Sequence, residues 1–345
     1  MNEGINQISF EPDLNSPKKK GVHKPIFAPT FINEPEIGEK PNKIYLLINP
    51  YSGRKRGRKV AEKATQLLEN AGISVESIYS DYAGHLVDIS SALSINSQDC
   101  IAVVGGDGSL SEVITGRMRT NSKELPRFAV IPAGTGNAQG TGMGIKNTED
   151  AIERIISGRT QSIDLAEVKL TSGSIKKPGK SMIWYSHNLV TWGLGVDSTI
   201  LAEKIRWAGP IRYDIGIVVM ILFNRRRKAT LTIDDTEIID DFTLFLIQNT
   251  QTGGSGLQLG PGASVDDGLM DLGILKRMTR RSIFKAFSML QKEARHVYHP
   301  SVKYHRFEKL KIETDEPTAI NIDGELIGCT PLEMRVLPNS IKIFV

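Results

Sequence analysis

Short apolar runs alternate with amphipathic stretches of helical spacing over residues 43–158. Four such runs lie at residues 43–48, 75–79, 101–104 and 128–131. Runs of this length that are apolar on both sides are typical of strands buried on both faces. Residues 60–70 carry apolar side chains at helical spacing, and Asn147 and Gly158 bracket another helix as its N-cap and its C-terminal glycine. The alternation predicts an open parallel sheet, which binds ligands beyond the carboxyl ends of its strands.

The pattern changes after Asp164, where strand-like segments follow one another with short turns between them. They lie at residues 165–170, 183–190, 230–233, 242–249, 270–275, 309–313, 319–322 and 334–337. Helices are predicted only near residues 198–223 and 282–294. Strands that follow one another in this way predict an antiparallel β domain.

Three segments follow from these patterns. Residues 1–41 show no sustained hydrophobic period and include three consecutive lysines, so we expect a disordered tail. Residues 42–164 are predicted to form an open α/β domain. Residues 165–345 are predicted to form an antiparallel β domain, with the last strand able to return to the first domain.

The loop after the third apolar run places three glycines around one carboxylate, Asp107. A helix is predicted to start at Ser109, and Ser109 with Glu112 has the spacing of a capping box. Unpaired backbone N–H groups at the positive end of a helix bind phosphate oxygens. A carboxylate beside phosphate is unfavourable unless a metal ion or a transferable proton involves it, so Asp107 is the candidate for chemistry.

Two further loops of small polar residues, 49–53 and 134–137, are predicted at the same edge of the sheet. Three such loops at one edge favour a nucleotide phosphate site over a plain tight turn. The chain has no G-x-x-x-x-G-K-[ST] loop, which excludes the P-loop NTPases, and no G-x-G-x-x-G after the first strand, which disfavours dinucleotide redox chemistry. No spacing of cysteine and histidine indicates zinc.

Composition adds modest limits to this picture. The 345 residues are 40% hydrophobic and 24% charged with a net charge of +4, which suits a globular protein that meets phosphates or an anionic membrane. Cys100 and Cys329 are the only cysteines, so we expect no disulfide framework and a reducing compartment. We expect neither a signal peptide nor a transmembrane segment.

An apolar run at residues 215–223 precedes a basic cluster at residues 225–228. This run could lie at an anionic membrane interface or form a buried helix with a solvated charged end. We favour the buried helix because the run is apolar on all sides. The basic run at residues 54–59 adjoins a predicted phosphate loop and does not require nucleic acid as a partner.

The ordered set of motifs resembles the diacylglycerol kinase catalytic-domain superfamily, which includes bacterial lipid kinases, sphingosine kinases and ceramide kinases. The motifs are Asn49-Pro50 with Ser52-Gly53, Ser80 with Gly84-His85, Gly105-Gly106-Asp107-Gly108-Ser109 with Glu112-Val113, residues 132–137, residues 261–268 and Asp323-Gly324-Glu325. Residues 192–194 and 203–213 resemble a segment of sphingosine and ceramide kinases. The resemblance covers residues 43–345.

This resemblance implies ATP-dependent transfer of phosphate to a lipid hydroxyl, with magnesium (Mg²⁺). Residues 42–164 would form an ATP-binding domain like that of phosphofructokinases and NAD kinases, and residues 165–345 would form a β-sandwich that binds the lipid substrate. The catalytic cleft would lie between the two domains. The resemblance also implies that ATP is bound by Asn49, Ser52, Ser80, Gly106, Gly108, Ser109, Gly134 and Thr135, with Arg206 and Arg212 on the phosphates. Asp107 would act as general base or hold Mg²⁺, and Glu325 would reach back to the metal or nucleotide. The implied enzyme is cytoplasmic and peripherally membrane-associated, with a lipid substrate at the membrane surface; a homodimer stays open.

The motifs give conflicting indications of the lipid acceptor. At residue 138 many bacterial diacylglycerol kinases have an aspartate, whereas this chain has Ala138, as sphingosine kinases do. At residue 199 sphingosine kinases have an aspartate for the sphingoid head group, whereas this chain has Thr199. Residues 323–344 look more like the bacterial diacylglycerol kinases. We expect diacylglycerol, with sphingosine or ceramide as the alternative. NAD kinase and a non-catalytic lipid or nucleotide sensor remain alternatives of other classes.

Overall fold

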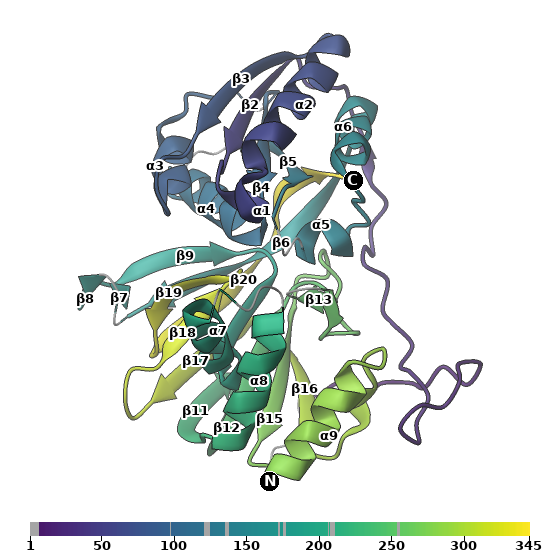
Figure 1. The fold of residues 1–345 in the computed structure, drawn as a ribbon, viewed down its shortest axis with the longest axis vertical. Helices are drawn as coiled ribbons and strands as arrows, with labels where there is room; N and C mark the ends of the chain where they lie inside the picture. The colour runs from purple at the N-terminus through teal and green to yellow at the C-terminus, as the bar shows by residue number, and fades with distance from the viewer. Residues whose placement is uncertain are drawn as a thin grey trace.

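The computed structural model describes residues 7–96, 98–120, 125–134, 138–171, 173–174, 177–205, 207, 211–253 and 256–345. These residues form two domains, one above the other along the long axis of the molecule (Figure 1). The first is a parallel α/β domain and the second is rich in antiparallel strands, which confirms the predicted fold class.

The first domain is built on four parallel strands in the order β3-β2-β4-β5. They are β2 (Lys43–Ile48), β3 (Ser74–Tyr79), β4 (Cys100–Gly105) and β5 (Arg127–Pro132). The helices are α1 (Ser52–Lys55), α2 (Gly57–Asn70), α3 (His85–Ala92), α4 (Asp107–Met118), α5 (Ala138–Gly142) and α6 (Thr148–Ser157). Helices cover both faces of the sheet, so every residue of β4 is buried. The caps predicted for α6 are confirmed: Asn147 accepts from the N–H of Asp150, and Gly158 ends the helix at a φ of 71°.

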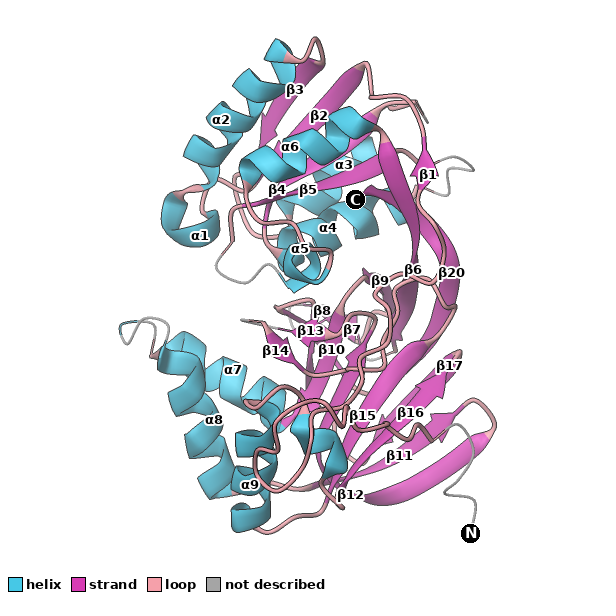
Figure 2. Cartoon of the chain, turned by 90° about the vertical axis from the view of Figure 1, so that its right-hand side faces the viewer, coloured by secondary structure: helices cyan, strands magenta, loops and turns pink. Residues whose placement is uncertain are grey.

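The second domain contains the long antiparallel strands. They are β6 (Arg159–Leu170), β9 (Met182–Ser186), β10 (Leu189–Gly193), β11 (Arg227–Ile233), β12 (Thr236–Gln248), β15 (Met270–Lys276), β16 (Val302–Phe307), β17 (Lys309–Thr314), β18 (Ala319–Ile322), β19 (Glu325–Cys329) and β20 (Leu332–Phe344). The short strands are β1 (Glu36–Ile37), β7 (Gly173–Ser174), β8 (Lys177–Pro178), β13 (Thr252–Gly253) and β14 (Leu257–Gln258). Three helices, α7 (Leu194–Lys204), α8 (Arg212–Phe223) and α9 (Arg280–Leu290), lie together on one side of this domain, and the 3₁₀ helix η2 (Arg295–Tyr298) follows α9 (Figure 2).

Two long strands join the domains. β6 and β20 pair along their length, and Ile343 of β20 also lies beside Phe128 of β5 in parallel register. The last strand therefore extends into the sheet of the first domain. The boundary placed at Asp164 falls inside β6, because that strand runs without interruption from one domain into the other.

The N-terminal segment follows a defined course along the second domain and then the first, although its sequence predicts disorder. Ile8 donates its N–H to the carbonyl of Tyr304, Val265 donates to Thr30, and Glu36 in β1 pairs with Thr160 of β6. Most of these contacts involve backbone atoms. A segment that is held in this way needs no periodic apolar pattern, so the sequence carries no signal for it.

The apolar run at residues 215–223 is only half buried, so the expectation of a buried helix is wrong for one of its faces. Gly216 and Ile221 of α8 face the domain, and a Cβ on Gly216 would lie 2.6 Å from the carbonyl oxygen of Ser198 in α7. Leu222 and Phe223 are 54% and 64% exposed. The described part of the chain contains no helix long and apolar enough to cross a membrane.

Candidate functional site

The carboxyl ends of the four parallel strands bring the predicted phosphate loops together. Asn49 donates its N–H to Val104 over 3.0 Å, and Ser80 donates its N–H to Ile48 over 2.9 Å. Gly134 donates to the carbonyl of Gly105 over 3.1 Å. These backbone bonds place the four loops side by side at one edge of the sheet, as parallel strand ends require.

Side chains and a close backbone approach tighten this edge. The amide of Asn49 donates to Ser109 Oγ over 3.2 Å, which joins the first loop to the start of α4. Gly53 has a φ of 54°, and a Cβ there would lie 1.9 Å from the carbonyl oxygen of Ala133. Only glycine allows the first loop to lie this close to the last one. Ser52 begins α1 and donates its N–H to Asn49. Thr135 and Arg206 lie outside the described residues.

Helix α4 begins at Asp107, two residues before the predicted start at Ser109. Its N-cap is Gly106, which has no side chain with which to accept a first-turn N–H. The predicted capping box is therefore wrong. The carboxylate of Glu112 instead accepts N–H groups of Gly84 and Leu86 over 3.0 and 3.3 Å, at the start of α3. A helix N-terminus without a side-chain cap is an arrangement that binds anions.

Glu325 reaches this helix from the second domain. A Cβ on Gly108 would lie 2.9 Å from both Cγ and Oε1 of Glu325, so the glutamate side chain packs directly against the first turn of α4. The turn before it contains Asp323 and Gly324 with φ values of 49° and 95°. The structure thus brings the acidic motif of the second domain to the glycine-rich turn of the first.

Asp323 organises the turn between β9 and β10. Its buried carboxylate accepts the hydroxyl of Ser186 over 2.9 Å and the N–H groups of His187, Asn188 and Leu189 over 3.2, 3.1 and 2.9 Å. Three backbone donors on one carboxylate hold this turn in a single conformation. The first acid of the Asp323-Gly324-Glu325 motif therefore serves the architecture of the site.

His187 is a residue of this site that the sequence analysis missed. Its Nε2 lies 3.1 Å from the carbonyl oxygen of Asp107 and 3.8 Å from Oδ2 of Asp323, and its side chain is fully buried. The predicted continuous strand at residues 183–190 is in fact two strands with the turn at His187 between them. The polar residues 186–188 inside that apolar run were the available signal.

Helix α4 is also fixed to the second domain along its side. Ser111 donates its hydroxyl to the carbonyl of Tyr185 over 3.1 Å and accepts the indole N–H of Trp184 over 2.8 Å. Thr115, one turn further on, accepts the N–H of Tyr185 over 3.1 Å. Ser111 and Thr115 are fully buried. The helix that carries Asp107 is thus held by both domains.

Arg212 stands at the start of α8, where it forms an ion pair with Glu203 of α7 over 3.6 Å. Helices α7 and α8 lie on the side of the molecule that also carries α1 (Figure 2).

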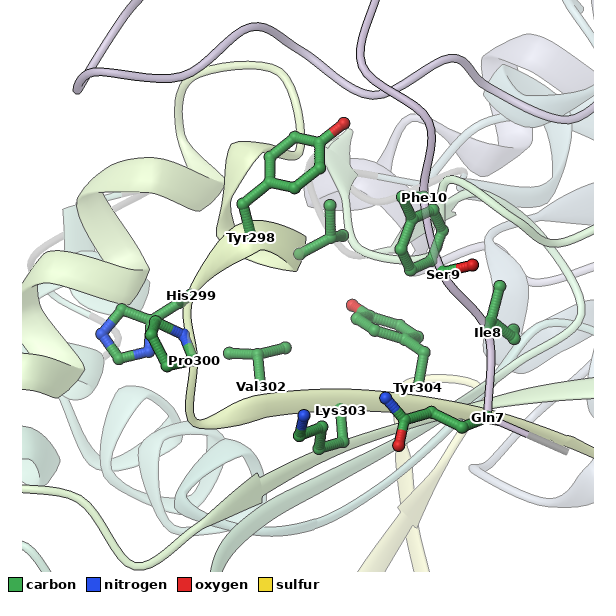
Figure 3. A pocket seen from close by; sticks show the side chains of 11 residues that line it. Gln7, Ile8, Ser9, Phe10, Tyr298, His299, Pro300, Val302, Lys303 and Tyr304 are labelled. Atoms are coloured by element: carbon green, nitrogen blue, oxygen red, sulfur yellow. The ribbon is translucent and has the colours of Figure 1, made fainter. Parts of the chain in front are cut away.

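Two cavities lie elsewhere in the molecule. One of about 290 Å³ lies between the N-terminal segment and the second domain; Gln7 and Phe10 line one side of it, and Tyr298, Val302 and Tyr304 line the other (Figure 3). The other, of about 550 Å³, is lined by Asp266, Asp267 and Asn339 among others. The residues that line them do not include any of the predicted phosphate or catalytic residues.

The assembled residues fit a nucleotide phosphate chain with Mg²⁺. The N-cap of α4 is a glycine, and Asp107 and Glu325 come to its first turn from opposite domains. The described residues contain no group of three or more acidic, histidine or cysteine side chains that could hold a metal ion by themselves. At phosphoryl-transfer sites Mg²⁺ is usually held by one or two carboxylates together with substrate phosphates, and Asp107 and Glu325 are the carboxylates that would hold it here.

Comparison with known proteins supplies the family. Residues 43–168 match the diacylglycerol kinase catalytic domain, and residues 188–345 match the YegS C-terminal NAD kinase beta sandwich-like domain. The chain is 30% identical over 316 residues to a diacylglycerol kinase of Mycobacterium tuberculosis, covering 89% of this chain and 95% of that protein. It is 26% identical to sphingosine kinase 1 of Arabidopsis thaliana, covering 84% of this chain and 69% of that protein.

A solved structure confirms the fold. The crystal structure of a putative diacylglycerol kinase from Bacillus anthracis superposes with a TM-score of 0.70 at 21% identity, covering 89% of this chain and 96% of that one. The family matches and the identity to the mycobacterial protein together show that this chain belongs to the diacylglycerol kinase catalytic-domain family of lipid kinases.

Proposed function

We propose that this protein transfers the γ-phosphate of ATP to the hydroxyl of a membrane lipid, and that the lipid is diacylglycerol. The main support is the packing of Glu325 against Gly108, which brings the acidic motif of the second domain to the phosphate-binding turn of the first. Neither an isolated nucleotide domain nor an isolated lipid domain would need this contact.

In this mechanism the chain mainly aligns the reactants. Backbone N–H groups at the start of α4 and in the loops at residues 49–53 and 134–137 hold phosphate oxygens, and Arg212 adds positive charge. Bound Mg²⁺ would neutralise charge on the phosphates. Asp107 accepts the proton of the lipid hydroxyl as the new O–P bond forms and the bond from the γ-phosphorus to ADP breaks. Glu325 completes the acidic pair from the second domain.

Contacts in α7 favour a neutral acceptor over a sphingoid base. Thr199 occupies the position at which the similar segment of sphingosine kinases has an aspartate. Its hydroxyl donates to the carbonyl of Gly195 over 3.0 Å. Both carboxylate oxygens of nearby Asp197 accept from Arg227 Nη2 over 2.9 Å. Asp197, the carboxylate that could take the place of the aspartate replaced by Thr199, is therefore already paired with Arg227. The positive charge of a sphingoid amine would find less negative charge to bind here.

The test is transfer of labelled phosphate from ATP, with Mg²⁺, to diacylglycerol, sphingosine, ceramide and NAD, the lipids being presented in detergent micelles. We expect label in diacylglycerol. Label in sphingosine or ceramide alone would contradict the acceptor, and label in NAD alone would contradict lipid kinase activity. No transfer to any acceptor, with ATP still bound, would favour a non-catalytic sensor.

A further inference from the structure

Helix α8 has one face packed on the protein and one face exposed to solvent. Gly216 and Ile221 face inward, where Gly216 allows the backbone of α7 to approach closely. On the other face, Ile215, Val218 and Leu222 are 37%, 39% and 54% exposed. Ile211, the N-cap of the helix, is 58% exposed.

These four exposed side chains form a continuous line, which we call the α8 stripe: Ile211, Ile215, Val218 and Leu222. Spacings of four, three and four residues place them on one side of the helix. Exposed apolar patches of this kind mark interaction sites on soluble proteins. Trp207, shortly before the helix, is 86% exposed, and tryptophan is a residue that prefers the headgroup level of a membrane.

Positive charge lies at the C-terminal end of the stripe. Arg225, Arg226 and Lys228 are exposed directly after α8. Arg280 of α9 donates its Nε–H to the carbonyl of Leu222 over 2.6 Å, which brings the exposed basic start of α9 to the same place. Arg281 beside it is exposed as well. We call these five residues the basic rim.

We propose that the α8 stripe and the basic rim dock this protein on an anionic lipid bilayer, an inference that builds on the proposed lipid acceptor but concerns binding in the absence of ATP. Apolar side chains enter the headgroup–acyl boundary while the basic side chains meet anionic headgroups. A bilayer fits better than a second copy of the chain, because an anionic surface supplies negative charge for the basic rim, whereas a two-fold contact with parallel α8 helices would bring two basic rims together. Helix α8 lies on the side of the molecule that also carries α1, which follows the first phosphate loop (Figure 2).

The test is co-sedimentation of the full-length protein, without ATP, with phosphatidylcholine vesicles that contain or lack phosphatidylglycerol. We expect binding to the anionic vesicles that weakens with salt. The triple variant Ile215→Gln, Val218→Gln and Leu222→Gln should bind at least about ten-fold less tightly. The matched control is Ile37→Gln, Ile183→Gln and Ile239→Gln, three isoleucines that are exposed away from α8, and it should bind like the unmodified chain.

The charge contribution has its own pair of variants. Arg225→Gln, Lys228→Gln and Arg281→Gln should reduce binding to anionic vesicles about ten-fold and weaken its salt dependence. The control Lys169→Gln, Lys309→Gln and Lys311→Gln removes three exposed lysines on other strands and should leave binding unchanged. Equal losses in both variants would show a diffuse charge effect and overturn the assignment to the rim.

Tryptophan fluorescence provides an independent readout. Trp184 and Trp192 are only 6% and 1% exposed, so a change in emission on addition of vesicles reports Trp207. We expect a blue shift and quenching by brominated lipids, both absent in Trp207→Phe. Undiminished vesicle binding by the stripe variant, or a dimer in solution that the same variant disrupts, would overturn the proposal. Vesicle binding without phosphate transfer to any lipid in micelles would leave docking intact and contradict the kinase function instead.

Discussion

Nε2 of His187 lies 3.1 Å from the carbonyl oxygen of Asp107. Through His187, the glycine-rich turn at residues 105–108 is connected to the acidic motif at residues 323–325. His187 is carried by the turn that Asp323 holds through three backbone N–H groups. Asp323 itself lies in the turn between β18 and β19, and Glu325 directly after this turn packs against Gly108. The backbone of Asp107 is therefore positioned by the second domain, and domain docking and site geometry depend on each other.

Replacing His187 should affect turnover more than ATP binding. His187→Ala removes a buried hydrogen bond, so we expect about a ten-fold loss of kcat, with little change in KM for ATP. His187→Gln keeps a donor near the carbonyl of Asp107 and should recover part of kcat. Steady-state kinetics with both variants, beside their thermal unfolding, separates positioning from stability. Equal kcat losses in the two variants would contradict the role of the hydrogen bond.

Asp107→Asn should bind ATP nearly as well as the unmodified chain and lose turnover by about 100-fold or more, because the amide cannot accept the hydroxyl proton. ATP binding by calorimetry and lipid phosphorylation by label transfer measure the two properties separately. Asp99→Asn, at the opposite end of β4, is the control. Turnover near normal in Asp107→Asn would argue against the assigned role.

Gly108→Ala tests the contact between the domains. Its methyl group would lie 2.9 Å from Glu325 Cγ and Oε1, so the glutamate must move while the helix itself gains from alanine. We expect kcat to fall about 10- to 100-fold, with the loss not adding to that of Glu325→Gln. Gly142→Ala, whose Cβ would meet Thr252 at an ordinary 3.4 Å, is the control. Fully additive losses would mean that the two residues act independently.

Asp266 should anchor the N-terminal segment. Its carboxylate accepts the N–H groups of Ile32 and Asn33 over 2.8 and 2.9 Å, and the amide of Gln161 over 2.8 Å. Asp266→Ala removes the acceptor of two part-buried N–H groups and of the buried Gln161 amide, so we expect the free energy of unfolding to fall by about 2 kcal/mol.

Hydrogen exchange near residues 28–33 should also become faster in Asp266→Ala. Asp267→Ala is the matched control, because its carboxylate accepts the N–H of Leu269 within its own turn. If both variants lose the same stability and the exchange rates of the N-terminal segment stay unchanged, the anchor does not exist.

Asp164 should make stability depend on pH. Burial raises the pKa of its carboxyl to about 6, against the N–H groups of Asn339 and Gly268, which favour the charged form. The folded chain therefore binds this proton more tightly than the unfolded chain does, and the stabilisation present below pH ~4 is lost as the pH rises through ~6.

The free energy of unfolding of the unmodified chain, measured relative to Asp164→Asn by urea denaturation, should fall by about 2 kcal/mol between pH ~4 and pH ~6 and then level off. Parallel stability curves for the two proteins across this range would contradict the raised pKa.

Local patterns were sufficient for much of the first domain. The apolar runs predicted β2, β3, β4 and β5, and the Asn147–Gly158 caps predicted α6, because burial on both faces and capping depend on residues close in sequence. The motif order indicated the family, and the alternation of strands and helices indicated that the glycine-rich loops share one edge.

Contacts between distant residues decided the rest. Glu112 has the spacing to cap its own helix, yet it caps α3, because that helix start lies beside it only in the folded chain. His187 joins the site through Asp323, which lies 136 positions away in sequence. Which side of α8 is exposed likewise depends on the elements that pack against its other side. Residues 215–223 are apolar on all sides, so their sequence does not indicate which face contacts the protein. Spacing along the chain determines elements and motifs, whereas the partner of a polar group or an apolar face depends on which elements pack against it.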